Sequence, residues 1–170
     1  MSMDATELVV DAFGRVRDVV HRTVDGRSPD ELVFRVDAEA NTIAWLVWHL
    51  SRVQDDHIAE VAGWEQVWTA GGWAARFGLP FDVAATGYGH GADDVAAVVA
   101  PPELLSAYYD AVHEQTMRYL AILTAEDLDT VVDTSWDPPV ILGVRLVSIV
   151  SDDLQHAGQA AFLPGLIQRR

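Results

Sequence analysis

The fold of this chain is decided first by residues 41–63, which read NTIAWLVWHLSRVQDDHIAEVAG. Asn41 is a residue type that often caps the start of a helix, and Gly63 is one that often ends a helix. Between them, inward-facing side chains recur three or four residues apart, which is the repeat of one face of an α-helix. These side chains are Ile43, Leu46, Leu50, Val53, His57 and Val61. We therefore expect an amphipathic helix along this stretch.

Three other segments show the same helical repeat of apolar residues. The first covers residues 9–23, after a candidate N-cap at Asp4. The second covers residues 101–123 and opens with two prolines and a glutamate, a favourable first turn. The last covers residues 142–161 and is expected to end before Pro164. The chain is thus expected to form four helices, and no segment alternates like a strand.

A long connection, residues 63–100, separates the second and third expected helices. It is rich in glycine, and its aromatic residues are Trp64, Trp68, Trp73, Phe77 and Phe81. A connection of this length in a compact domain usually has a function or a packing role of its own. The pattern predicts an all-α four-helix bundle with a long crossover between its second and third helices. We expect one domain over residues 1–170.

The composition excludes several classes of function. The 170 residues carry 11 basic and 26 acidic side chains, a net charge of −15, with neither lysine nor cysteine. Nucleic acids and anionic membranes are therefore not expected as partners, because phosphate binding needs clustered basic residues. A cysteine nucleophile and cysteine-bound zinc are excluded. An acidic start and the lack of any run of ~18 apolar residues predict no signal peptide and no membrane span, hence a cytoplasmic protein.

The most informative anomaly lies in the last expected helix. Asp152 and His156 are four residues apart, so both lie on one otherwise apolar helix face. His49 lies on the inward face of the second helix. Two imidazoles and one carboxylate suit zinc, and equally ferrous iron or nickel, with a position left for water or substrate. The alternative is an ordinary hydrogen-bonded Asp–His pair and a histidine satisfied within the core.

The remaining histidines are weaker candidates for metal ligands. His57 follows His49 by eight residues, ~12 Å along a straight helix, so both cannot bind one ion. We expect His57 to pack in the apolar stripe or to bond a neighbour. His113 is the reserve imidazole ligand, and Asp153 is the reserve carboxylate. His21 and His90 are expected to be exposed.

Two motifs give the sequence a resemblance to a known family. Residues 41–50, NTIAWLVWHL, and residues 152–160, DDLQHAGQA, together resemble the DinB-like superfamily, in its branch that includes mycothiol-dependent maleylpyruvate isomerase. The resemblance implies a four-helix bundle, often dimeric, that holds a divalent metal through His49, Asp152 and His156. Many members have histidine where this chain has Asp152, and the isomerase-like branch has glutamate. The shorter aspartate would draw the ion towards the last helix.

The resemblance also implies a function. It points to a metal-dependent thiol S-transferase or isomerase, with zinc as the first expectation for the metal, nickel or iron as alternatives, and mycothiol as thiol co-substrate. A chain without cysteine must take its thiol from another molecule, and a bound cation makes the thiolate available at neutral pH. The partners would be a small-molecule thiol, an acceptor substrate and a second copy of the chain. Two alternatives stay open: a metalloenzyme of other chemistry, and a non-catalytic, stress-related dimer.

Five residues are candidates for binding the substrate. The two arginines among them would receive a carboxylate of the thiol or acceptor, and the aromatic residues would form a lid or an apolar wall. The alternatives are solvated surface arginines, and a separate hydrophobic cluster or dimer contact for the connection. The candidates are Trp45, Arg52, Trp68, Trp73 and Arg145.

Overall fold

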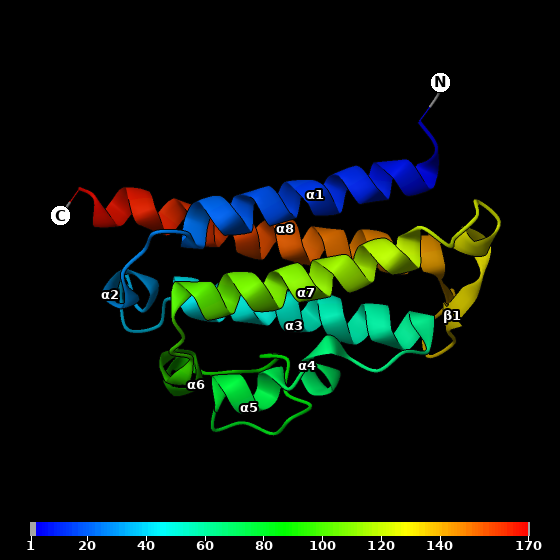
Figure 1. The fold of residues 1–170 in the computed structure, drawn as a ribbon. Helices are drawn as coiled ribbons and strands as arrows, with labels where there is room; N and C mark the ends of the chain where they lie inside the picture. Colours follow the sequence, from blue (N-terminus) through cyan, green and yellow to red (C-terminus); the bar gives the residue numbers. More distant parts are fainter. Residues whose placement is uncertain (1–2, 170) are drawn as a thin grey trace.

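Four long helices form the bundle that the sequence predicts. The computed structural model describes residues 3–169. The long helices are α1 (Ala5–Val24), α3 (Ile43–Ala62), α7 (Pro102–Leu120) and α8 (Leu142–Ile167). Helices α1 and α3 each pack against both α7 and α8 (Figure 1). The predicted all-α four-helix bundle is confirmed, and no helix in residues 3–169 is both long and apolar enough to cross a membrane.

Short elements connect the long helices. Between α1 and α3 lies α2 (Pro29–Leu32), and the connection from α3 to α7 contains α4 (Val67–Ala70), α5 (Trp73–Phe77) and α6 (Ala92–Ala97). Between α7 and α8 lie the 3-10 turn η1 (Asp127–Asp129) and the antiparallel strands β1 (Val131–Asp133) and β2 (Val140–Ile141), which pair Val131 with Ile141 and Asp133 with Val140. The sequence did not predict this hairpin because its strands are too short to show an alternating pattern.

The helix ends follow local chemistry, but the predicted start of α3 and the predicted end of α8 need correction. Asp4 caps α1 as expected, in a reciprocal capping box with Glu7. Thr42, rather than the predicted Asn41, caps α3, and its hydroxyl accepts a hydrogen bond from the Trp45 backbone N–H at 3.0 Å. Helix α8 does not end before Pro164 but continues to Ile167. Leu163 and Pro164 are buried, so packing of this last turn offsets the single backbone hydrogen bond that proline removes.

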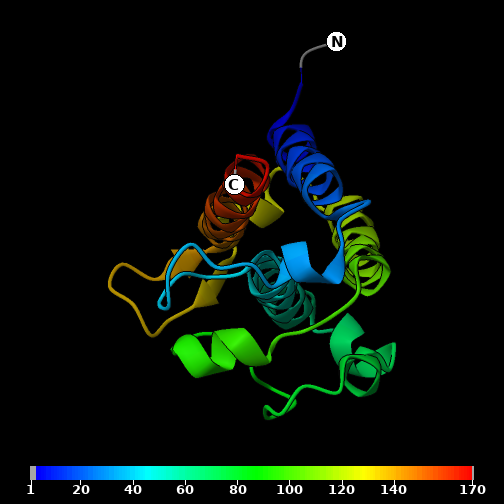
Figure 2. The same ribbon diagram turned by 90° about the vertical axis from the view of Figure 1, so that its left-hand side faces the viewer.

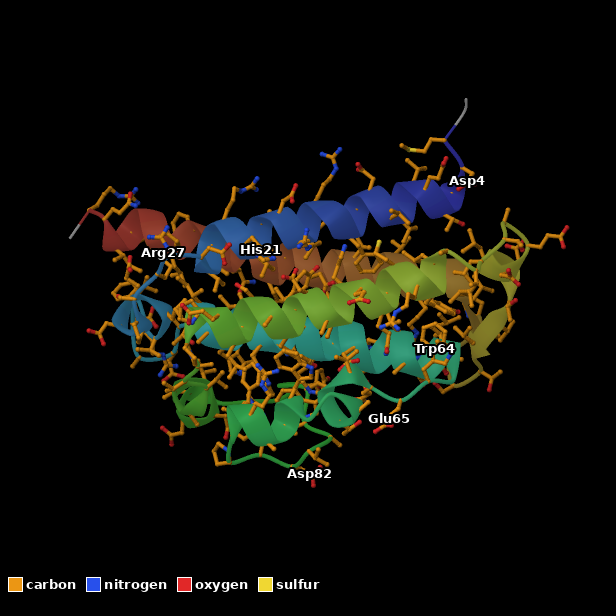
Figure 3. All side chains as sticks on the ribbon, in the orientation of Figure 1. Asp4, His21, Arg27, Trp64, Glu65 and Asp82 are labelled. Atoms are coloured by element: carbon orange, nitrogen blue, oxygen red, sulfur yellow. The ribbon has the colours of Figure 1, made fainter. Side chains whose placement is uncertain are left out.

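The connection from α3 to α7, residues 63–101, packs along the outside of α3 and α7, away from α1 (Figure 2). We call it the crossover segment. Trp68 and Trp73 are buried there, with ring centroids 5.1 and 5.5 Å from that of Tyr108 on α7. They belong to the main hydrophobic core, and not to a separate cluster as the alternative expectation had it. Trp64 is 40% exposed at the end of α3, and Asp82 points outward from the crossover segment (Figure 3).

Candidate metal centre

The three predicted ligand residues lie together where α3 faces α8. His49, Asp152 and His156 each offer one ligand atom, and these atoms lie within 4.8 Å of one another. The rings of His49 and His156 meet edge to face, with centroids 4.6 Å apart. Asp152 and His156 share one face of α8 because four residues make about one helical turn. His49 is buried, and the other two side chains are partly exposed, so the cluster borders on solvent.

The crossover segment fixes the orientation of His49. Its Nδ1 lies 2.6 Å from the backbone carbonyl oxygen of Thr86. A carbonyl only accepts, so Nδ1 carries the proton and Nε2 is left as the free donor atom for a metal. The next residue, Gly87, has φ +98°, and a Cβ there would lie 2.6 Å from His49 Nδ1. Glycine therefore allows the loop to approach the imidazole this closely.

His156 is oriented by its own helix. Its Nδ1 lies 2.9 Å from the backbone carbonyl oxygen of Asp152 and 3.2 Å from the Asp152 carboxylate oxygen Oδ2. Nδ1 again carries the proton, which leaves Nε2 free. The contact to Oδ2 does not have hydrogen-bond geometry, so this buried oxygen is without a hydrogen-bond partner among the described residues. An orphaned carboxylate oxygen beside two free imidazole nitrogens fits a divalent cation, which would satisfy all three.

The electrostatics prepare two of the three groups for metal binding. Burial lowers the pKa of His49, against the effect of its bond to Thr86, and so favours the neutral imidazole that metals bind. Burial opposes the charge on Asp152, but the imidazole of His156, 3.2 Å from its carboxylate, and nearby His49 outweigh burial and lower its pKa. The close Asp152 carboxylate in turn raises the pKa of His156. A cation that binds here therefore competes with a proton for His156, more so as the pH falls.

Aromatic side chains surround the two imidazoles. The Trp45 ring stacks on His49, and its Nε1–H donates to Nδ1 of His90 at 3.2 Å. His90 also stacks on Trp48 and lies 4.4 Å from Phe81, between ring centroids. The expectation of an exposed His90 is therefore wrong, because aromatic rings cover it. Its loop position gave no periodic signal that could have placed it beside the site.

The two arginines expected to bind a substrate carboxylate have other partners. Arg52 is completely buried, and it donates from Nε to the Ala85 carbonyl at 3.1 Å and from Nη1 to Gln66 at 2.8 Å. Arg145 donates to Asp133 at 2.8 Å. Neither guanidinium is free, so the geometry does not fit the carboxylate-binding role. Trp45 does lie against the two histidines of the ligand cluster, whereas Trp68 and Trp73 pack under the crossover segment.

The other titratable candidates are placed elsewhere. His113 lies on α7 beside Tyr109, with ring centroids 6.1 Å apart, and is not part of the ligand cluster. His57 bonds neighbours as expected, since its Nδ1 is 3.7 Å from Glu60 and 3.5 Å from Arg145. His21 was expected to be exposed, but it is half-buried between α1 and α7. The reserve carboxylate, Asp153, is fully buried, and its side chain has no hydrogen-bond partner within residues 3–169.

Two hollows flank the ligand cluster along the line where α3 and α8 meet. One turn beyond His49 and His156 is an uncharged hollow of ≈180 Å³, lined by Ala40, Asn41, Leu46, Gln159, Phe162 and Leu163. About two turns in the other direction is a polar hollow of ≈450 Å³, lined by Asp56, His57, Ala59, Glu60, Trp64, Gln66, Asp133 and Arg145. Neither hollow is lined by one of the three ligand residues.

Comparison with known proteins agrees with this architecture. A family model described as mycothiol-S-transferase matches residues 8–168. The chain belongs to this family. The resemblance to the DinB-like superfamily inferred from the two motifs is thereby confirmed. A comparison with curated proteins gives no match.

A solved structure supports the same fold. The crystal structure of a conserved protein from Enterococcus faecalis is 29% identical to this chain, with a TM-score of 0.91. The match covers 99% of this mycothiol S-transferase family member and 100% of the other chain. The whole architecture described here, including the crossover segment, is thus shared with that protein.

Proposed function

We propose that His49, Asp152 and His156 bind one divalent cation, with zinc as the first expectation. The observation that supports this most is that His49, Asp152 and His156 each bring one ligand atom within 4.8 Å of the others, while Asp152 Oδ2 has no hydrogen-bond partner among residues 3–169. Two histidines and one carboxylate form a common catalytic zinc ligand set. Three protein ligands leave a coordination position for a molecule from outside, as catalytic sites require.

We further propose that the molecule which takes this position is a low-molecular-weight thiol of the mycothiol type. The protein would then use this thiol to catalyse an S-transfer to an acceptor substrate, or the isomerisation of that substrate. Membership of the mycothiol S-transferase family supports the thiol. The chain contains no cysteine, so the sulfur nucleophile must come from a second molecule. A divalent cation at the site would lower the thiol pKa and supply thiolate at neutral pH. The acceptor would then lie in one of the flanking hollows.

The protein's own groups have separate tasks in this proposal. The Nδ1–H bonds of His49 and His156 to backbone carbonyls fix both rings before the cation arrives, which reduces the cost of binding it. Trp45 forms an apolar wall beside both imidazoles and keeps water from that side. Asp152 supplies the negative charge that makes a site with two neutral imidazoles attractive to a cation.

We also propose a homodimer, supported by the outer surface of α8. Four apolar side chains are exposed there at helical spacing, and no charged residue separates them along that face. They are Val144, Val147, Leu154 and Phe162, which are 51%, 62%, 43% and 63% exposed. Light scattering of the wild type and of Val147→Glu tests this, with a monomeric variant as the expected result. A monomeric wild type would refute it.

Metal analysis tests the central proposal. Protein purified without a nickel column should contain about one equivalent of zinc, whereas iron would point to another chemistry and no metal to a non-catalytic bundle. His156→Ala should lose the metal and keep its helical circular dichroism. His113→Ala is the matched control, since this half-buried histidine is outside the cluster. Retention of metal by His156→Ala would remove His156 from the site.

Thiol binding is tested separately on the cobalt-substituted protein. Addition of mycothiol should change the visible absorption spectrum, because a sulfur donor that enters the open position alters the ligand field. A stoichiometric metal together with an unchanged spectrum would leave the metal site in place and contradict the thiol chemistry.

A further inference from the structure

The carbonyl group that orients His49 belongs to the crossover segment, not to the bundle. Thr86 accepts the Nδ1–H bond, and Gly87 lies against the imidazole so closely that no Cβ fits. The direction of His49 Nε2 therefore depends on whatever fixes residues 85–87 against α3. The segment's own helices, α4, α5 and α6, are only four to six residues long, and side chains of α3 anchor the segment to the bundle.

Arg52 provides that anchoring. It lies three residues after His49 on α3, and its side chain is 0% exposed. Its Nε donates to the Ala85 carbonyl at 3.1 Å, immediately before Thr86, and its Nη1 donates to Gln66 at 2.8 Å. Its guanidinium also covers the Trp68 ring, 4.9 Å from the centroid. One planar group thus joins the beginning and the late part of the crossover segment to α3.

Asp55 completes this buried arrangement. Its carboxylate accepts hydrogen bonds from the Val67 and Trp68 backbone N–H groups, both at 2.8 Å, and from the Tyr108 hydroxyl at 2.9 Å. It lies 3.6 Å from Arg52 Nη1, so it compensates the buried guanidinium charge. Burying an ion pair costs desolvation energy that apolar side chains of similar size would not incur. Stability alone does not explain why a pair stands here.

We propose that Arg52 is a positioning residue for the metal centre. By holding Ala85, it keeps the Thr86 carbonyl on His49 Nδ1, and so keeps His49 Nε2 directed at Asp152 and His156. The inference rests on the proposed metal site, but the contact it explains exists without any metal. It also gives the buried guanidinium a function in place of the substrate-binding role expected from the sequence.

Arg52→Lys tests the proposal with the charge retained. A lysine ammonium is a point charge on a flexible stem and does not reproduce the rigid fork that reaches Ala85 and Gln66 together. The matched control is Thr116→Val, which removes the buried Gln54–Thr116 hydrogen bond of 2.7 Å and leaves the crossover segment untouched. Zinc affinity is measured by chelator competition, and the His49 Nδ1–H resonance of the metal-free protein is followed by nitrogen-15 NMR.

Arg52→Lys should bind zinc about 10- to 100-fold more weakly and lose or weaken the His49 Nδ1–H resonance. Thr116→Val should keep the wild-type zinc affinity and the His49 Nδ1–H resonance, even if its Tm falls as much as that of Arg52→Lys. The proposal is overturned if folded Arg52→Lys keeps both readouts at the wild-type level, or if the control loses as much. If the wild type binds no zinc, the proposed function fails, and the resonance alone decides the role of Arg52.

A second variant disturbs the contact between Thr86 and His49 from the side of the loop. Gly87→Ala places a Cβ against His49 Nδ1 and at a φ that L-residues rarely adopt, so the loop must withdraw from the imidazole. It should reproduce the weakened zinc affinity and the altered resonance, even if Arg52→Lys does not fold. Wild-type values in Gly87→Ala would show that the Thr86 contact does not orient His49, and would refute the proposal.

Discussion

The Trp45 ring lies parallel to that of His49, with centroids 4.6 Å apart and an angle of 11° between the planes. The two residues are one helical turn apart on α3, and the same indole meets the His156 ring edge-on at 6.4 Å. The indole is therefore in contact with both proposed imidazole ligands. This makes Trp45 a built-in reporter for the site.

Binding of a paramagnetic divalent cation should quench part of the tryptophan fluorescence, because Trp45 would lie within contact distance of the ligand rings. Trp45→Phe should remove most of this quenching and keep the ring stacking, so metal affinity should change by only a few-fold. Trp136→Phe is the control, since Trp136 is 67% exposed in the hairpin region. Cobalt titrations followed by emission check this, and full quenching in Trp45→Phe would place the cation elsewhere.

The charge around the site predicts which thiols bind it. Among the described residues that line the two hollows, Arg145 is the only arginine and it is paired with Asp133. The chain as a whole carries −15. Uncharged thiols should therefore bind the cobalt protein better than carboxylate-bearing thiols of similar size, by about tenfold at low salt. Spectral titrations with 2-mercaptoethanol and mercaptoacetate measure the ratio, which should shrink as salt is added.

A stronger binding of mercaptoacetate would contradict this interpretation. It would mean that Arg145 leaves Asp133 to receive the carboxylate. Arg145→Gln would then abolish the preference, which separates that outcome from direct binding of the carboxylate to the cation.

His21 should make the stability of the bundle depend on pH. Burial opposes its charge, but hydrogen bonds to Asp110 at 2.9 Å and Asp25 at 3.0 Å outweigh burial and raise its pKa above 6.5. A raised pKa in the folded state stabilises the protein fully below pH 6.5, and this contribution is lost as pH rises through the folded value. His21 lies on α1 (Figure 3), so its bond to Asp110 joins α1 to α7.

His21→Gln should therefore destabilise the protein more in mildly acidic than in mildly alkaline buffer. Urea unfolding of both proteins across this range measures the difference. His57→Gln serves as the control because His57 lies outside the His21 pair. An effect of His21→Gln that is independent of pH would show that the two carboxylates do not hold the charged imidazole.

The periodicity of apolar residues was enough to predict the four long helices, because each helix buries one face along most of its length. It could not find the β1–β2 hairpin, where only two residue pairs are joined. It also predicts too early an end for α8, at Pro164, because the local effect of proline does not include the packing of Leu163. Local rules decide helix ends only where tertiary contacts do not compete with them.

The candidate site likewise has residues that the sequence could place and residues that it could not. His49, Asp152 and His156 could be placed together in advance because all three lie on helix faces whose direction the repeat fixes. Thr86 and His90 could not, because they belong to a loop whose path depends on the whole fold. The carboxylate-binding role predicted for Arg52 does not fit, because the crossover segment folds back over α3 and buries this side chain. An arginine on a helix is usually solvated, so nothing in the sequence indicated this burial.

Asp153 and Asp152 are neighbours on α8, yet they should respond to substitution in opposite directions. Asp153 is fully buried and has no hydrogen-bond partner in the described part of the chain. Burial, followed by the charge of Asp152, raises its pKa well above 3.8. Above pH 3.8 the unfolded chain ionises this carboxyl while the folded protein keeps it protonated. Stability therefore falls as pH rises towards the folded pKa, by about 1.4 kcal/mol per pH unit for one proton.

Asp153→Asn removes this titration, so the variant should gain stability over the wild type as pH rises above the acidic range. Asp152→Asn should do the reverse in the metal-free protein, because the pKa of Asp152 is lowered in the folded state, and its stabilising effect is present above pH 3.8 and lost in acid. Urea unfolding of both metal-free variants against pH measures the two trends. A loss of stability in Asp153→Asn that grows with pH would mean that the folded protein holds Asp153 as a carboxylate, with a buried partner that compensates its charge.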